Sequence, residues 1–103
     1  MKSILYFFLL LTSLAWADEP APNVNDVFEL ANEKYRNGDY AAAVEGYESL
    51  VTNFERESSD LYFNIGNCYY KLGKIAPAIY YFEKALLLNP NDEAIQTNLS
   101  FAQ

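Results

Sequence analysis

Residues 59–91 read SDLYFNIGNCYYKLGKIAPAIYYFEKALLLNPN, and this stretch decides the fold. Its apolar residues recur at three- and four-residue spacings on both sides of Gly73, which predicts two amphipathic helices. Gly73 suits the left-handed residue that ends the first helix, Pro77 fits the first turn of the second, and Pro90 stops it. The stretch is therefore a predicted helical hairpin, in which the small residues Gly66 and Ala78 let the two helices cross closely.

A second copy of this hairpin lies upstream, as expected because one hairpin cannot cover its own apolar faces. Superimposing Gly38 on Gly73 aligns Ala43 with Ala78 and Tyr47 with Phe82. The shift is 73 − 38 = 35 residues, one more than the 34-residue period of tetratricopeptide repeats. We expect the extra residue in the polar turn at 55–58.

Both hairpins resemble the tetratricopeptide repeat (TPR) family. The second repeat carries the family pattern nearly complete, whereas the first has Lys34 where a tyrosine is usual and lacks a closing proline. The pattern residues of the second repeat are Tyr62, Ile65, Gly66, Tyr69, Gly73, Ala78, Phe82, Ala85 and Pro90. The resemblance implies an all-α fold, a right-handed α-solenoid of two TPR hairpins and a C-terminal capping helix.

The chain before the repeats reads as a targeting segment and a linker. Residues 1–17 have a basic start, a short apolar run and the small-residue site Ala15-Trp16-Ala17, which predicts a cleaved signal peptide. An uncleaved anchor is the alternative, although the apolar run is shorter than the roughly 20 residues of a spanning helix. Residues 18–24 follow as a predicted flexible linker.

The predicted TPR domain covers residues 25–103. Repeat 1 occupies about 24–58, repeat 2 about 59–92 and the capping helix about 92–103. Asn25 is the expected cap of the first helix, over 26–37, and the second is expected at about 40–53. Asn91 or Asp92 is expected to cap the last helix, whose apolar residues are Ile95, Leu99 and Ala102.

Composition excludes several kinds of function. The chain has 7 Lys and Arg against 14 Asp and Glu, and removal of Lys2 with the signal peptide would leave a net charge of −8. Such an acidic chain repels nucleic acid. There is no histidine, metal-ligand spacing, nucleophile motif or phosphate loop, so we predict no enzyme, no catalytic or metal-binding residue, no cofactor and no small-molecule substrate.

Three acidic or sulfur-containing features have plain interpretations. The pairs Glu29/Glu33 and Glu45/Glu48 share helix faces, which is typical of solvated acidic surfaces. Cys68 is the one cysteine and cannot close an internal disulfide. We interpret it as a small packed side chain; an intermolecular disulfide and a reactive thiol are the alternatives.

A repeated polar pattern marks the candidate binding site. An aromatic residue, an asparagine and a cation recur at i, i+4 and i+8 on the first helix of each hairpin, with a tyrosine before each cation. In TPR proteins these helices line the concave side, where asparagine can hold a peptide backbone and a cation can meet a carboxylate. The predicted peptide-binding groove comprises Phe28, Asn32, Tyr35, Arg36, Phe63, Asn67, Tyr70 and Lys71. The alternative is that these positions have no binding role, because asparagine and a basic residue are common there in TPRs of every function.

A second candidate surface lies on the last hairpin helix. Tyr80 and Leu87 stand where the first repeat has Glu45 and Thr52, and Tyr81 adds to the apolar area. The three predict an outer contact patch for another chain or for a missing C-terminal segment. Scattered surface tyrosines are the alternative.

The order of signal peptide, linker, two hairpins and closing helix resembles the N-terminal region of the E-type Bat proteins of bacterial aerotolerance operons. That resemblance implies export to the periplasm or cell envelope of a bacterium and a role in envelope protein assembly or stress tolerance. The leading hypothesis is a non-enzymatic adaptor that holds an extended peptide or partner protein in its groove. The alternative is a structural self-association or docking module of a longer membrane-attached protein, with membrane contact only through a missing C-terminal segment.

Overall fold

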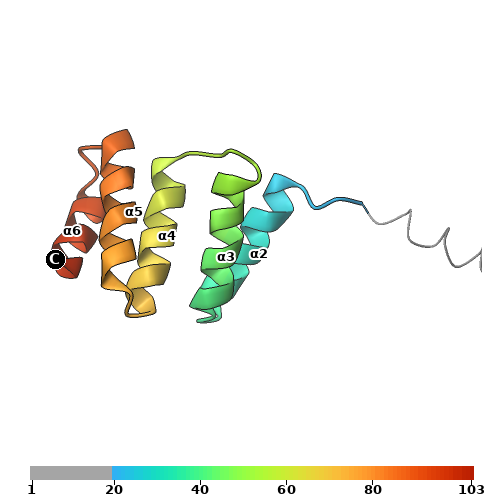
Figure 1. The fold of residues 1–103 in the computed structure, drawn as a ribbon, viewed down its shortest axis with the longest axis horizontal. Coiled ribbons are helices and arrows are strands. Elements are labelled where there is room, and N and C mark those ends of the chain that lie inside the picture. Colours follow the sequence, from blue (N-terminus) through green and yellow to red (C-terminus); the bar gives the residue numbers. More distant parts are fainter. Residues whose placement is uncertain (1–19) are drawn as a thin grey trace, which may run out of the picture.

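The computed structural model describes residues 20–103, which form five helices and no strand. Successive helices stand side by side in chain order (Figure 1). The predicted all-helical fold of two hairpins and a C-terminal helix is therefore confirmed. The hairpins are α2–α3 and α4–α5, and the bounds are α2 Val24–Arg36, α3 Tyr40–Thr52, α4 Ser59–Lys71, α5 Ile75–Leu88 and α6 Glu93–Ala102. The predicted signal peptide lies outside the described residues.

The two hairpin corners have the same backbone geometry. Gly38 and Gly73 adopt φ values of +80° and +76°, a left-handed conformation that glycine enters without strain. At each corner the glycine N–H and the next N–H return to carbonyls in the last turn of the preceding helix. The second of these bonds joins Asp39 N to Lys34 O at 2.9 Å and Lys74 N to Tyr69 O at 2.9 Å. The predicted role of Gly73 is confirmed.

Helix starts give the repeat period directly. α2 and α3 begin 40 − 24 = 16 residues apart, and so do α4 and α5 at 75 − 59 = 16. From α3 to α4 the distance is 59 − 40 = 19, whereas from α5 to α6 it is 93 − 75 = 18. The extra residue therefore lies between the start of α3 and the start of α4, where Glu55 has a positive φ of 52°.

The first helix starts earlier than predicted. Asn23, not Asn25, is the cap, and its side chain accepts a hydrogen bond from Asp26 N at 2.9 Å. This register places the acidic Asp26 in the first turn, where the helix dipole favours negative charge. Val24 consequently belongs to α2 and not to the linker. Of the two expected caps of α6, Asn91 and Asp92, the structure has Asp92, whose side chain accepts from Ala94 N and Ile95 N.

The core runs along the interior of the helix stack. Phe82 is fully buried, and a Cβ atom added to Gly66 would lie 2.6 Å from its ring. Gly66 thus makes room for the Phe82 ring between α4 and α5, a more specific role than the close backbone crossing expected from the sequence. The buried core residues are Ala31, Ala43, Val44, Tyr47, Leu50, Leu61, Tyr62, Ile65, Cys68, Ala78, Phe82, Ala85, Ile95 and Ala102.

A polar contact joins the two hairpins. Tyr69 of α4 and Tyr81 of α5 stack with ring centroids 5.8 Å apart. Both hydroxyls donate to the Glu48 carboxylate of α3, Tyr81 at 3.4 Å. The hydrogen bond to Glu48 is the main cause that raises the pKa of Tyr69 above its ordinary value of 10.0. The hydroxyl therefore stays protonated and able to donate at neutral pH.

Cys68 lies in the core close to this contact. Its side chain is fully buried, and burial, with the nearby Glu48 charge, raises the pKa of the thiol to about 12. A thiol that stays protonated and inaccessible is a poor nucleophile. The interpretation of Cys68 as a packed side chain agrees with this placement.

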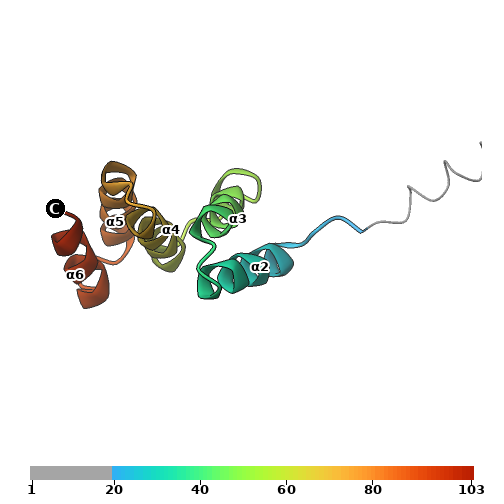
Figure 2. The ribbon, with the colours of Figure 1, turned by 90° about the horizontal axis from the view of Figure 1, so that it is seen from below.

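The final helix covers the second hairpin. Ile95 and Ala102 of α6 are buried, and Leu99 is half-buried. Seen from below, α2, α4 and α6 lie lower than α3 and α5, so the first helix of each hairpin and α6 share one side (Figure 2). Among residues 20–103, no helix combines the length and the apolar character needed to cross a membrane.

Candidate functional site

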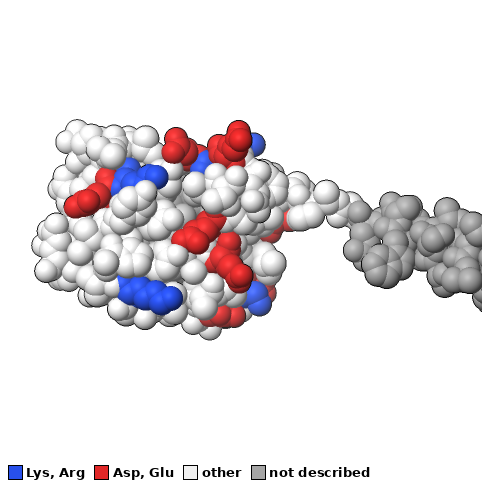
Figure 3. Space-filling view, viewed as in Figure 1, with Lys and Arg blue, Asp and Glu red and all other residues white. Residues whose placement is uncertain are grey.

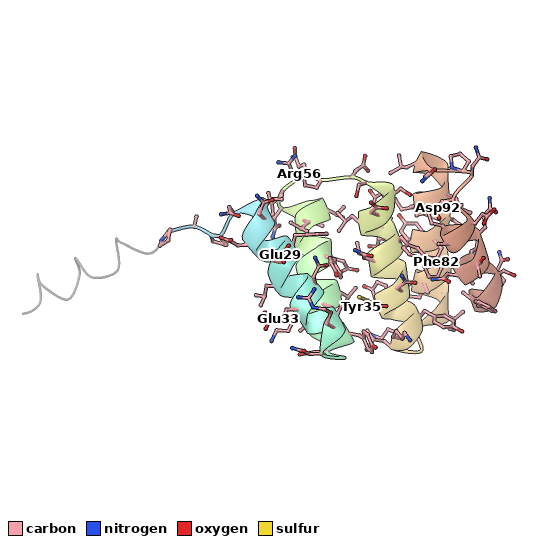
Figure 4. The ribbon with its side chains drawn as sticks, turned by 180° about the vertical axis from the view of Figure 1, so that it is seen from behind. Glu29, Glu33, Tyr35, Arg56, Phe82 and Asp92 are labelled. Atoms are coloured by element: carbon pink, nitrogen blue, oxygen red, sulfur yellow. The ribbon has the colours of Figure 1, made fainter. Side chains whose placement is uncertain are left out.

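The shared side of α2, α4 and α6 contains a cleft of about 200 Å³, here called the inner cleft. It is lined by Tyr35, Asn67, Tyr70, Lys71, Asn98 and Phe101. Four of these six were predicted groove residues. The structure brings Tyr35 of the first repeat to the same cleft as Asn67, Tyr70 and Lys71 of the second, and Figure 4 shows Tyr35 near the end of α2 that faces α4.

The walls of the inner cleft are aromatic. Tyr70 and Phe101 are exposed, Phe101 to 72% of its surface. Tyr35 is half-buried, and its ring centroid lies 5.2 Å from that of Tyr40. Burial raises the pKa of Tyr35, so the phenol is neutral at physiological pH. Neutral aromatic walls of this kind suit an apolar side chain.

The polar groups of the inner cleft are an amide pair and a cation. The Asn98 amide donates to Asn67 Oδ1 at 2.8 Å, which links α6 to α4. Asn67 retains its own N–H donors, and among residues 20–103 they have no hydrogen-bond partner. Lys71 is exposed in the last turn of α4. Amide donors suit peptide carbonyls, and the ammonium group suits a carboxylate.

The other four predicted groove residues do not line the inner cleft. Phe28 packs edge-on against Tyr47 with ring centroids 6.0 Å apart, and Phe63 packs against Phe82 at 5.9 Å. Both rings are half-buried, because each lies beside the large ring that the second helix of its hairpin sends into the core. Arg36 is exposed at the end of α2.

Asn32 has a structural contact within the first hairpin. Its side-chain oxygen accepts a hydrogen bond from the Tyr47 hydroxyl at 2.5 Å. Burial is the main cause that raises the pKa of Tyr47 to about 12, so this donor is present at all physiological pH values. The contact stabilises the packing of α2 on α3.

Sequence reasoning missed the contribution of α6 to the cleft. The sequence predicts only a covering role for residues 92–103, the segment that contains Asn98 and Phe101. Shifting Asn67 by the 34-residue distance between α4 and α6 arrives at Phe101. Extending the repeat alignment to α6 would therefore have predicted that this helix contributes to the inner cleft.

The three residues of the predicted outer patch do not form one surface. Tyr81 is half-buried and faces the first hairpin, where it contacts Glu48. Tyr80 is 55% exposed, and Lys84 Nζ lies 5.3 Å from its ring centroid. Leu87 is 82% exposed and lines a different cleft with Leu99 of α6.

Acidic residues concentrate on the first hairpin. Residues 20–58 contain eight acidic and three basic side chains, which gives a net charge of −5. Residues 59–103 contain four acidic and three basic side chains, which gives a net charge of −1. Most acidic side chains visible in Figure 3 lie over the α2–α3 end. Lys71 therefore stands in the nearly neutral half, where a ligand carboxylate meets little repulsion.

The acidic side chains of the described residues are dispersed and do not gather as metal ligands. In residues 20–103 no three His, Cys, Asp or Glu side chains gather as ligands for a metal ion. Glu29 and Glu33 are exposed on α2 (Figure 4). Glu45 is exposed to solvent, whereas Glu48 accepts hydrogen bonds from tyrosine hydroxyls of the second hairpin. The two carboxylates of this pair therefore lie in different environments.

Comparison with known proteins agrees with this geometry. Residues 59–92, which comprise α4, α5 and the following turn, match the sequence model of the tetratricopeptide repeat. Over 69 residues, 67% of this chain, the sequence is 33% identical to proteins named tetratricopeptide repeat protein 16 from Macaca fascicularis and Homo sapiens. The matched segment spans 8% of the length of each of these relatives. The chain therefore carries a tetratricopeptide repeat whose two helices are α4 and α5.

Proposed function

We propose that this protein is a non-enzymatic adaptor that holds an extended peptide segment of a partner protein in the inner cleft. The tetratricopeptide repeat suggests a role in protein–protein interaction. The observation that carries the peptide-binding proposal is the convergence of Tyr35, Lys71 and Phe101, from three different helices, on one cleft. A surface built across α2, α4 and α6 suits a ligand that extends across the helices.

The chemistry of the cleft defines the ligand. A cleft of about 200 Å³ is smaller than the roughly 300–1,000 Å³ of sites for drug-sized molecules, which favours a single side chain over a cofactor. The three aromatic rings would hold an apolar side chain, and the amides of Asn67 and Asn98 would meet the peptide backbone. Lys71 would meet a carboxylate, from an acidic side chain or a C-terminus. The ligand is thus a peptide with an apolar residue beside an acidic group.

A displayed peptide library selected on the full chain tests this proposal. We expect the recovered peptides to share an apolar residue next to a carboxylate. Their affinity should fall about tenfold or more in the Asn67→Ala plus Lys71→Glu variant, because a hydrogen bond to a charged group contributes about 1.5–3 kcal/mol. Phe101→Ala should also weaken binding.

Matched controls separate the cleft from general surface effects. Arg56→Glu makes the same charge change as Lys71→Glu in the exposed α3–α4 turn, outside the inner cleft. Leu87→Ala removes a similarly exposed apolar side chain that also lies outside it. Both variants should bind the selected peptides as the unaltered chain does. Unchanged affinity in the Asn67→Ala plus Lys71→Glu variant would reject the inner cleft as the binding site.

The proposal includes export to the periplasm or envelope of a bacterium, with a role in envelope protein assembly or stress tolerance. It is supported by the signal-peptide pattern of residues 1–17 and by the resemblance to the E-type Bat proteins. Expression of the full chain in a bacterium, followed by N-terminal sequencing of the periplasmic fraction, tests the export step. The expected first residue is Asp18; recovery of only the intact Met1 form from the cytoplasm would contradict it.

A further inference from the structure

A second cleft lies at the end of the helix stack, between α5 and α6. This end cleft, of about 590 Å³, is lined by Glu83, Leu86, Leu87, Pro90 and Leu99. Leu87 is 82% exposed, and the half-buried Leu86 and Leu99 line the same cleft. Apolar side chains this exposed and this close together mark an interaction surface when they are contiguous.

The repeat relates the end cleft to the interior contact between the hairpins. A shift of 35 residues takes Glu48 to Glu83, and a shift of 34 takes Ile65 to Leu99. In the interior, Glu48 is half-buried and accepts hydrogen bonds from Tyr69 and Tyr81. At the end, the equivalent Glu83 is exposed. The carboxylate at this repeat position therefore accepts hydrogen bonds in the interior, at Glu48, and is exposed at the end of the stack, at Glu83.

α6 already occupies one of the two helix positions beside the end cleft. Its buried residues Ile95 and Ala102 are equivalent to Leu61 and Cys68 of α4, which are buried too. α6 thus packs on α5 as α4 packs on α3. Leu99 marks the difference, because its equivalent Ile65 is completely buried while Leu99 is only half-buried.

The uncovered position is the one that α5 takes beside α4. Within residues 20–103, no helix packs on α6 in that way. Gln103 is equivalent to Tyr69, so α6 itself supplies no tyrosine to Glu83. A helix that fills the position would therefore have to supply the hydroxyl, as α5 does with Tyr81.

We propose that the end cleft binds an amphipathic helix of a partner protein, with a tyrosine of that helix donating to Glu83. The apolar face of the helix covers Leu86 and Leu99, the equivalents of Val51 and Ile65. It extends beyond the repeated contact to reach Leu87, because the equivalent Thr52 is exposed in the interior. The occupant is a helix and not the extended peptide of the inner cleft, because the interior contact that this surface repeats is made by a helix. The nearly neutral charge of residues 59–103 suits an apolar partner.

The test uses a peptide with the sequence of α5, Ile75–Leu88, because this helix fills the equivalent interior position. Binding of the labelled peptide to the full chain is measured by fluorescence anisotropy, with a scrambled peptide as control. We expect saturable binding. Replacement of the peptide tyrosine equivalent to Tyr81 by phenylalanine should weaken it about tenfold.

A double-mutant cycle isolates the proposed hydrogen bond. In the Glu83→Gln chain, the same tyrosine-to-phenylalanine change in the peptide should cost only about two- to fivefold, because the glutamine amide oxygen still accepts the hydroxyl but in a neutral hydrogen bond of about 0.5–1 kcal/mol. A peptide that instead displaced α5 would place its tyrosine beside Glu48. The loss of affinity on changing that tyrosine to phenylalanine would then be the same with and without Glu83→Gln. An equal loss in both chains, or binding no better than that of the scrambled peptide, would overturn the proposal.

Control variants keep the two clefts apart. Leu87→Ala should weaken binding of the helical peptide but not of the inner-cleft peptides. Phe101→Ala should weaken binding of the inner-cleft peptides but not of the helical peptide. Glu29→Gln removes an exposed acid of α2 and should change neither. Sedimentation of the chain alone tests for a second copy as the occupant: a dimer that excludes the peptide and dissociates in Glu83→Gln would overturn the assignment to a partner protein.

Discussion

At the scale of single residues, the packing of α4 on α5 depends on the absence of a side chain at Gly66. The Phe82 ring fills that space and is fully buried, so it cannot move aside for a neighbour. Protein interiors are packed closely enough that one added methyl group changes the fit. Gly66 is therefore required for packing and not for backbone conformation, unlike Gly38 and Gly73 with their positive φ values.

Gly66→Ala should lower the free energy of unfolding by about 1–2 kcal/mol, because overpacking costs about 1–3 kcal/mol and the gain in helix propensity returns at most about 1 kcal/mol. Chemical denaturation followed by circular dichroism measures the change. Ser100→Ala is the matched control, since Ser100 is the equivalent residue of α6 and is exposed. That variant should be neutral or slightly stabilising. Unchanged stability in Gly66→Ala would show that the Phe82 ring is not held as described.

At the scale of elements, α6 has two roles that meet in one short helix. It covers α5 with Ile95 and Ala102, and it supplies Asn98 and Phe101 to the inner cleft. An isolated helix of 10 residues is marginal in water, so α6 depends on its cap and on packing. Asp92 is the cap, with its carboxylate accepting from Ala94 N at 2.9 Å and Ile95 N at 3.2 Å.

Asp92→Ala should cost about 1 kcal/mol of stability and should also weaken binding of the selected peptides in the inner cleft, because α6 frays. Denaturation and peptide titration of the same preparation measure both effects. Asp39→Ala removes the corresponding cap of α3, whose carboxylate accepts from Ala42 N at 3.2 Å. It should give a similar loss of stability with unchanged peptide affinity. Equal peptide affinity in both variants would separate α6 from the inner cleft.

At the scale of the whole molecule, the first hairpin is held to the rest of the described chain largely by the surface that α3 presents to α4. Repeat arrays gain their stability from such contacts between neighbours. Here the contact includes an ionisable group, because Tyr69 and Tyr81 both donate to Glu48. The stability of the array should therefore depend on the protonation of these tyrosines.

The raised pKa of Tyr69 gives this dependence its sign. The folded chain keeps the Tyr69 proton above pH 10, where the unfolded chain releases it, so the stabilisation is complete below about pH 10 and is lost as pH rises further. Tyr47 and Tyr62, whose pKa values burial raises to about 12, add to the loss over the same range. The unfolding midpoint should thus be steady from pH 7 to 9 and fall above pH 10.

Tyr69→Phe should reduce stability at pH 7 and make the decline above pH 10 shallower, as measured by thermal unfolding across that range. Tyr80→Phe changes a ring that is 55% exposed and outside the Glu48 contact, and it should reproduce the profile of the unaltered chain. Parallel profiles for Tyr69→Phe and the unaltered chain would contradict the role assigned to the Glu48 contact.

Local features were predictable from the sequence because neighbouring residues alone determine them. The corner at Gly73, the stop at Pro90 and the cap at Asp92 each depend on the backbone within one turn. Orientation around a helix was less predictable: Tyr81, expected on an outer patch, faces α3, and Phe28, expected in the groove, packs on Tyr47. These directions depend on how one helix is rotated against the next, which no short segment contains.

By itself, the sequence determined that the chain folds as paired helices with a repeat near 34 residues. The reason is that helix periodicity, caps and corners depend on residues that are close together in the sequence. Only the tertiary structure decided which equivalent residues are covered. Leu30 and Ile65 occupy the same place in the repeat, yet Leu30 is 55% exposed and Ile65 is completely buried. The physical reason is that burial of a repeat residue depends on the neighbouring helices, and α3 packs against α4 while no described helix precedes α2.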